Sequence, residues 1–276
     1  MTLFANETSL RTLQKLIASK TSALLVAGPS GVGLKTLTEN ILQREKSEII
    51  PILPEKNDRI DLEKGRITVE SIRRLYDVTK TVQPKGRVIV IDYAERMAAP
   101  AQNAFLKLLE EPPEATRFVL LSHTPELLLP TILSRVQRID VRPIGREQSL
   151  ALLDELKVTD ATKRAQLLFI AEGLPAMLYK LATDDTYFAD RAAIVKDARQ
   201  LITGTPYNRL LLAKQYKDDR EKALTLLNDA MRQVSGSLVQ SGEEKALRTL
   251  TALQKTHQTI TEQGNIRLQL SQLAVQ

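Results

Sequence analysis

Short apolar runs that alternate with helical patterns dominate the first half of the chain and restrict its fold. Five of these runs are rich in leucine or β-branched residues: 23–27, 49–53, 88–92, 117–122 and 138–141. Such runs are typical of strands whose two faces are both buried, as in a parallel sheet. Between two of them, Val69 and Ile72 recur at helical spacing behind a candidate N-cap, Thr68. The pattern predicts an α/β domain in which two helical layers enclose a parallel sheet.

After residue 143 the strand pattern stops and only helical patterns remain. Three short helices are expected at 146–156, 160–172 and 175–182, with Gly173 ending the second. Helices continue from Tyr187 to the end of the chain. Breaks between them are expected at four glycines: Gly204, Gly236, Gly242 and Gly264. We therefore predict three pieces, an α/β domain at 1–143, a small helical domain at 144–186 and an all-helical domain at 187–276.

Composition narrows the possible chemistry. The chain has no cysteine, which excludes disulfides, thiolate zinc sites and cysteine nucleophiles. Its two histidines, His123 and His257, are too few for a histidine metal centre, so no metal site is expected. No apolar run approaches the length of a membrane span, and the first residues lack a secretory signal, so we expect a cytoplasmic protein with no membrane partner. The net charge of +6 favours polyanionic partners such as nucleic acid.

A glycine-rich turn follows the first expected strand. Gly28, Gly31 and Gly33 precede a helical pattern that begins with Lys35 and Thr36, the context of a phosphate-binding loop. Such a loop needs lysine directly after its last glycine and a hydroxyl residue after the lysine. Here the residue after Gly33 is leucine, so the lysine is one position late. One residue of slip rotates a helical side chain by about 100°. Nucleotide binding would then require a bulged loop, and the alternative is a purely structural turn.

The strand at 88–92 ends on Asp92, at the position where ATPases with a phosphate-binding loop have the aspartate that holds the Mg²⁺ shell. The next residue, normally the glutamate that orients water, is Tyr93, whose phenol is a poor base at neutral pH. Glu95 lies two residues further on and is expected to point elsewhere. Asp92 is either a metal ligand or a turn former at the strand end. Two defects in one catalytic apparatus argue against hydrolysis by this chain, and we expect no bound cofactor.

Two motifs resemble the clamp-loader branch of the AAA+ proteins, and in particular its delta-prime group. The first is NAFLKLLEEPP at 103–113, and the second is LPTILSR at 129–135. The segment GNIRLQL at 264–270 resembles the final helix of these subunits. The resemblance implies an AAA+ domain with a P-loop-type parallel sheet, a helical lid and a C-terminal helical collar. It also implies partners: gamma/tau-type and delta-type clamp-loader subunits and, through the assembled ring, the sliding clamp and primer-template DNA.

The resemblance assigns one residue a catalytic role. Ser134-Arg135 matches the family's serine-arginine motif, which implies that Arg135 acts in trans on the ATP site of a neighbouring subunit. Val136 stands where the family usually has cysteine, and the family's four-cysteine zinc module is absent. The segment GLPA at 173–176 stands where active relatives have a nucleotide-sensing arginine, and that arginine is absent here. At the sensor position for the γ-phosphate stand His123 and Thr124.

Three functions follow from these observations. The first is a non-hydrolysing clamp-loader subunit that supplies Arg135 and a scaffold. The second is an active ATPase of the gamma type with a bulged loop, against which Lys35 and Tyr93 both argue. The third is a DNA-binding module that acts alone, suggested by the net charge. A surface ion pair is the alternative role for Arg135.

Overall fold

The computed structural model describes residues 3–57, 59–62, 64–80, 83–241 and 244–275, excluding the side chains of 237–241. It separates into two compact units, Met1–Ala182 and Thr183–Gln276. The first expected division, at 143–144, therefore lies inside one compact unit. The second, at 186–187, lies within the first turn of a helix that begins at Asp185.

The expected parallel sheet is present in the first unit. Its strands are β1 (Ala23–Ala27), β2 (Glu48–Ile52), β5 (Arg87–Ile91), β6 (Thr116–Ser122) and β7 (Gln137–Asp140). They pair in the order β2-β5-β6-β1-β7, and every pairing is parallel. The three central strands are buried along nearly their whole length, whereas the edge strands β2 and β7 are partly exposed. A small antiparallel pair that was not expected, β3 (Glu55–Lys56) with β4 (Arg59–Ile60), lies outside this sheet.

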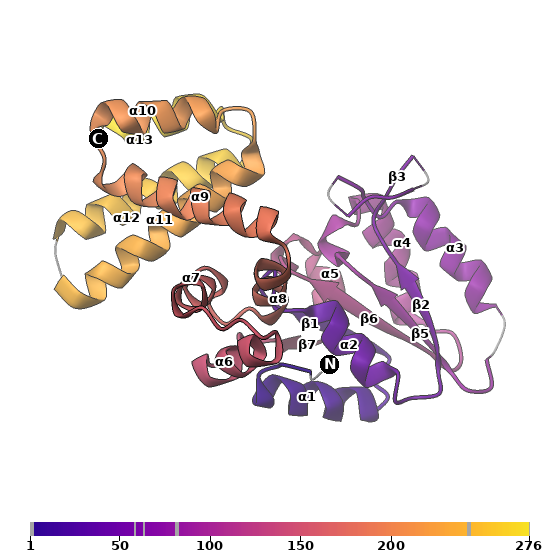
Figure 1. Cartoon of the computed structure of the whole chain (residues 1–276). Coiled ribbons are helices and arrows are strands. Elements are labelled where there is room, and N and C mark those ends of the chain that lie inside the picture. The colour runs from indigo at the N-terminus through magenta and orange to yellow at the C-terminus, as the bar shows by residue number, and fades with distance from the viewer. Residues whose placement is uncertain (1–2, 58, 63, 81–82, 242–243, 276) are drawn as a thin grey trace. The chain divides into compact units, whose positions relative to one another are not determined.

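Helices cover both faces of the sheet. They are α1 (Glu7–Ala18), α2 (Leu34–Leu42), α3 (Val69–Thr79), α4 (Ala99–Glu110) and α5 (Pro130–Leu133), with 3-10 turns η1 (Ala94–Arg96) and η2 (Pro125–Leu127). Because successive strand residues point to opposite faces, Leu24 and Val26 pack toward α1 and α2, and Leu25 packs toward α3 and α4 (Figure 1). Thr68 caps α3 as predicted, its side chain accepting the Ser71 N–H. The three-layer prediction is confirmed.

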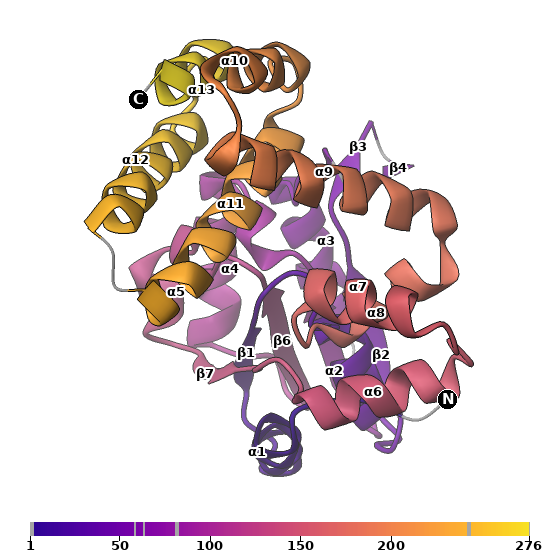
Figure 2. The ribbon, with the colours of Figure 1, turned by 60° about the vertical axis from the view of Figure 1, so that its left-hand side comes forward.

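Three short helices complete the first unit: α6 (Arg146–Glu155), α7 (Ala161–Ala171) and α8 (Pro175–Thr183). They lie within two residues of the expected ranges and gather beside the start of α2 (Figure 2). We call them the lid segment. Gly173, with φ 77°, lies directly after the left-handed cap residue Glu172 and so ends α7 as expected. Its carbonyl accepts the Ile144 N–H, which ties the lid segment to the end of the core.

The second unit is all helical. It contains α9 (Asp185–Thr203), α10 (Pro206–Gln215), α11 (Arg220–Ser241), α12 (Glu244–Thr261) and α13 (Ile266–Val275). The breaks expected at Gly204 and Gly264 are confirmed, and Gly242 lies outside the described residues. The break expected at Gly236 is wrong, since that residue lies inside α11. A helical glycine costs only about 1 kcal/mol relative to alanine, which the packing of α11 against α9 and α12 offsets.

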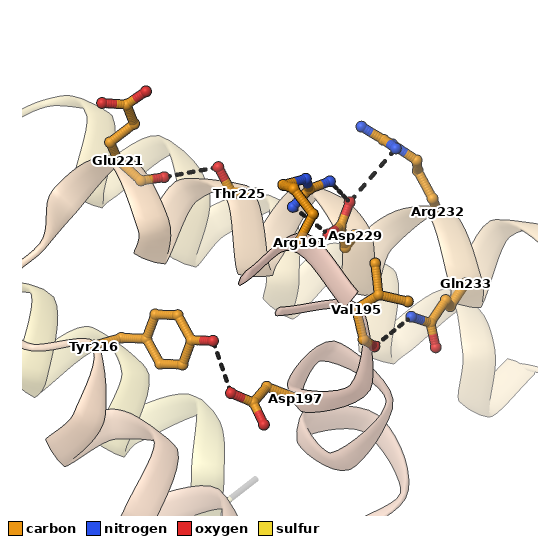
Figure 3. Close-up of polar contacts among 9 residues, drawn as sticks. All are labelled: Arg191, Val195, Asp197, Tyr216, Glu221, Thr225, Asp229, Arg232 and Gln233. Carbon is orange, nitrogen blue, oxygen red and sulfur yellow. Dashed lines mark hydrogen bonds and ion pairs between the residues drawn. The ribbon is translucent and has the colours of Figure 1, made fainter. Parts of the chain in front are cut away.

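Buried polar contacts connect the helices of the second unit (Figure 3). The Arg191 guanidinium on α9 makes two hydrogen bonds to the Asp229 carboxylate on α11, at 3.0 and 3.3 Å. The Tyr216 hydroxyl, which follows α10, donates to Asp197 on α9 at 2.7 Å. These contacts fix which faces of the three helices meet.

Candidate functional site

The carboxyl ends of three adjacent strands bring the predicted site residues to one edge of the sheet. Gly28 follows β1, Asp92 follows β5, and His123 follows β6, which lies between those two strands. In parallel α/β sheets this edge is where ligands bind. The glycine-rich loop and the acidic strand end are therefore parts of one site.

The first glycine of the loop is held by the end of β6. The Gly28 N–H donates to the Ser122 carbonyl at 3.2 Å, and the Gly28 carbonyl lies 2.9 Å from Nδ1 of His123. Because a carbonyl oxygen only accepts, Nδ1 of His123 carries the proton. An added Cβ on Gly28 would lie 2.9 Å from the Val141 carbonyl, so the position needs glycine for space alone.

The middle of the loop is closed by the lid segment. The Gly31 carbonyl accepts the backbone N–H groups of Ala176 and Met177, at 2.9 and 3.1 Å, from the first turn of α8. Gly31 has φ 89°, and a Cβ there would lie 2.9 Å from Cβ of Met177. Gly33 has φ 85° and is the N-cap residue of α2. The left-handed backbone explains both glycines without any ligand.

The side chains after the loop determine what the site can bind. Leu34 stands where a working loop has its lysine, and it is only 2% exposed, packed in the core beneath α2. Lys35 and Thr36 are exposed on the first turn of α2. No side chain among the described residues caps this helix, so its first amides keep the partial positive charge of a helix N-terminus. The loop thus has the shape of a phosphate cradle but lacks the lysine that would neutralise a triphosphate.

The acidic strand end is also altered. Asp92 is 6% exposed, and burial raises the pKa of its carboxyl above the ordinary value, an effect that the Lys35 ammonium opposes. Lys35 occupies the position whose hydroxyl would hold Mg²⁺, so a cation of the chain itself acts on Asp92. The residues present therefore do not fit a Mg²⁺–nucleotide complex. Among the described residues, no group of three or more acidic or histidine side chains is arranged to hold a metal ion.

Tyr93, which replaces the expected base, has an unusual backbone and is enclosed by its neighbours. Its φ is 54°, in the left-handed region that bulky residues rarely adopt. The ring lies edge-on to His123, with centroids 5.5 Å apart, and the Arg96 guanidinium stacks 4.8 Å from the ring centroid. Burial and the Asp92 carboxylate raise the pKa of the phenol, which removes it further from general-base chemistry.

Glu95, expected to point elsewhere, is used structurally. One carboxylate oxygen accepts the backbone N–H of His123 at 3.3 Å, and the other is buried without a hydrogen-bond partner in the described structure. His123 therefore contacts both the loop and the acidic turn. Apart from the position of His123 at the end of an apolar run, nothing in the sequence predicts this bridge.

An apolar cavity of about 340 Å³ lies beside the loop, between the core and the lid segment. Gly33 lines it from the loop and Thr36 from the first turn of α2. Leu152, Pro175 and Tyr179 line it from the lid segment. None of the described lining side chains carries a charge. The cavity offers apolar contact but no counter-charge for a phosphate.

Arg135, the remaining predicted site residue, lies two residues beyond the end of α5, directly after the C-cap residue Ser134. Its guanidinium forms an ion pair with Glu110, the last residue of α4, at 2.8 Å. The Arg135 side chain is 38% exposed. The ion-pair alternative is therefore realised within this chain, while the guanidinium stays open to solvent.

In the described part of the chain, none of the helices has the length and apolar character that a membrane span requires.

Comparisons with known proteins agree with the motifs. A family model described as "DNA polymerase III, delta subunit" matches residues 5–145, just over half of the chain. The delta-prime subunits of Bacillus subtilis and Pseudomonas aeruginosa DNA polymerase III are 28% and 30% identical over 64% and 67% of this chain. The chain spans only 57% and 62% of the length of these two relatives.

The solved structure of a DNA polymerase III gamma subunit-related protein from Thermotoga maritima has the same fold. It is 20% identical, with a TM-score of 0.51 over 97% of both chains. The AAA+-like fold and the family match agree. The chain belongs to the DNA polymerase III delta-prime subunit family, among the clamp-loader relatives of the AAA+ proteins.

Proposed function

We propose that this chain is the non-hydrolysing delta-prime-type subunit of a cytoplasmic clamp loader, which scaffolds the ring and supplies Arg135 to a neighbouring ATPase subunit. The observation that carries the non-hydrolysing role is the burial of Leu34 where the phosphate-binding lysine is required. Closure of the loop by α8, the Lys35 ammonium acting on Asp92, and Tyr93 in place of a base add support.

A nucleotide titration of the isolated chain tests the missing chemistry. We expect no Mg²⁺-dependent turnover, and the same weak ATP binding for the native chain and for Lys35→Ala. Micromolar binding with turnover that Lys35→Ala abolishes would instead establish the alternative, an active gamma-type ATPase with a bulged loop.

The trans role of Arg135 is supported by its partial exposure and by the chemistry of its side chain. A guanidinium keeps its charge at any physiological pH and stabilises the charge that develops on a transferring phosphoryl group, an effect worth about 10³–10⁵ in rate. The pair with Glu110 is half-exposed, so the guanidinium can meet a phosphoryl group of a neighbouring subunit while the pair persists.

Arg135→Ala in a loader reconstituted with its ATPase subunits tests this role. We expect assembly to persist and DNA- and clamp-stimulated hydrolysis to fall by at least tenfold. Arg138→Ala is the matched control. Arg138 lies on β7, which follows α5 and Arg135 along the chain, is 43% exposed, and pairs with Asp140 of the same strand at 2.7 Å. Unchanged hydrolysis in Arg135→Ala, or an equal loss in the control, would contradict the assignment.

We assign the second unit to the collar, through which the chain would join gamma/tau-type and delta-type partners. Several large apolar side chains of α10 and α13 are exposed, among them Tyr207, Leu211 and Leu268. Truncation after Ala182, at the boundary of the first unit, should abolish ring assembly. Retention of assembly by the folded fragment would place the subunit interface elsewhere. Contact with the sliding clamp and primer-template DNA follows only through the assembled complex.

A further inference from the structure

The two motifs that carry the family resemblance meet at one ion pair. Glu110 ends α4 in the first motif, and Arg135 follows α5 in the second, with Nη2 of Arg135 2.8 Å from Oε1 of Glu110. Their side chains are 51% and 38% exposed. The pair is thus at the surface of the first unit, where another chain has access to it.

The position of Glu110 is not explained by the stability of its own helix. The C-terminus of a helix carries partial negative charge, so an acidic residue there is unfavourable. The adjacent Glu111, the C-cap residue, has the same disadvantage. The guanidinium of Arg135 offsets this disadvantage only for Glu110.

Contacts of both terminal nitrogens hold the Arg135 guanidinium in place, and two of its N–H donors remain available. Nη1 of Arg135 donates to the Thr131 carbonyl at 3.0 Å and to the Ser134 hydroxyl at 3.3 Å. Nη2 contacts Glu110. Within the described part of the chain, the Nε–H and the second Nη2–H of Arg135 make no hydrogen bond. A guanidinium fixed in this way can donate its remaining N–H groups to a phosphoryl oxygen without leaving its present contacts.

We propose that Glu110 is a positioning residue for Arg135, which holds the guanidinium in the orientation that the neighbouring phosphoryl group meets. This inference rests on the proposed trans role of Arg135. Without Glu110, the guanidinium keeps only the Nη1 contacts to its own short helix and samples further rotamers. The consequence is a lower rate in the neighbouring site, while the affinity of that site for ATP stays the same, since the neighbour binds the nucleotide itself.

A double-mutant cycle in the reconstituted loader tests the inference. Glu110→Ala should lower kcat of DNA- and clamp-stimulated hydrolysis about 2- to 5-fold, the effect of one half-exposed charge pair, with KM for ATP unchanged. Glu110→Gln, which keeps an oxygen acceptor, should recover part of the loss. Glu111→Ala, one residue away and exposed, should behave as the native chain. Glu110→Ala combined with Arg135→Ala should be no slower than Arg135→Ala alone.

The outcomes separate the two claims. If Arg135→Ala is impaired but Glu110→Ala is not, or if the two losses multiply, Glu110 does not act through Arg135 and the inference is overturned. A faster rate in Glu110→Ala would also overturn it, because Glu110 would then restrain the guanidinium. If Arg135→Ala is itself without effect, the trans role fails and the inference fails with it. Thermal unfolding of each variant checks that the fold is intact.

Discussion

The buried ion pair of the second unit offers a severe test of how that unit is held together. Arg191 and Asp229 make a two-pronged contact between α9 and α11, and their side chains are only 9% and 4% exposed (Figure 3). Arg232 approaches the same carboxylate at 3.5 Å from an exposed position. Asp229 therefore compensates a guanidinium that has lost most of its hydration.

The perturbation is Asp229→Asn, which keeps the shape of the side chain and removes its charge. The guanidinium of Arg191 then stays buried without a counter-charge, and removal of one partner of such a pair costs about 3–5 kcal/mol. For a unit of this size, each kcal/mol shifts the thermal midpoint by about 4–8 °C. The midpoint of the second unit should fall by at least about 12 °C.

Two further variants determine whether desolvation is the cause. Arg191→Met combined with Asp229→Leu removes both charges, so it should cost far less than Asp229→Asn alone. Arg232→Ala removes an exposed partner and should cost at most about 1 kcal/mol.

Thermal unfolding of the full chain gives the midpoint and urea unfolding gives the free energy, both followed by circular dichroism. Each fit must allow separate transitions for the two units, since two compact units need not unfold together. A cost below about 1 kcal/mol for Asp229→Asn would refute the reasoning. So would a double variant that is as unstable as the single one, because the loss would then come from packing and not from an uncompensated charge.

Three smaller predictions test other contacts. Burial and the bond to Asp197 raise the pKa of the Tyr216 phenol above 10.0, so its contribution to stability is complete below pH 10 and is lost as pH rises toward the folded-state pKa. Tyr216→Phe should cost about 1 kcal/mol at pH 8, and a deficit in the unfolding free energy that does not shrink above pH 10 would contradict this. Gly31→Ala should cost at least about 1–2 kcal/mol in urea unfolding, because its φ is 89° and its Cβ would collide with Met177. Gly236→Ala, with nothing within 4 Å of its Cβ inside α11, should instead stabilise the chain by about 1 kcal/mol, and equal effects of the two changes would exclude the steric explanation.

The sheet could be predicted because its signal is local. The run at 23–27 is β1 residue for residue, and the other four runs match their strands to within one residue at each end. In the three central strands, continuous burial leaves no polar alternation, so the apolar run itself marks the strand. The roles of Thr68 as a helix cap and of Gly173 as a helix end could be predicted for the same reason. A capping side chain and a left-handed glycine each act within a few residues of their helix.

The contacts that define the site could not be predicted, because they join residues far apart in the chain. The bond between His123 and Gly28 spans 95 positions, and the bond from Ala176 on α8 to Gly31 spans an even longer stretch of the chain. Neither has a periodic pattern, since each depends on where two separate elements meet after folding. The same holds for the pair of Arg191 with Asp229, whose buried charges appear in the sequence only as one more basic and one more acidic residue.

The loop separates the two requirements that a phosphate site normally combines. Glycines satisfy the first, which is backbone shape, and here Gly28 and Gly31 are each required by close contact or by positive φ even without a ligand. Lysine in the correct register satisfies the second, which is charge, and its position is taken by the buried Leu34. A glycine pattern alone therefore predicts a strand–turn–helix shape in this protein, whereas the residue after the last glycine decides whether that shape binds a triphosphate. Since the fold depends on the first requirement and hydrolysis on the second, the AAA+-like core can stay intact without the lysine, as the proposed presentation of Arg135 to a neighbouring subunit requires.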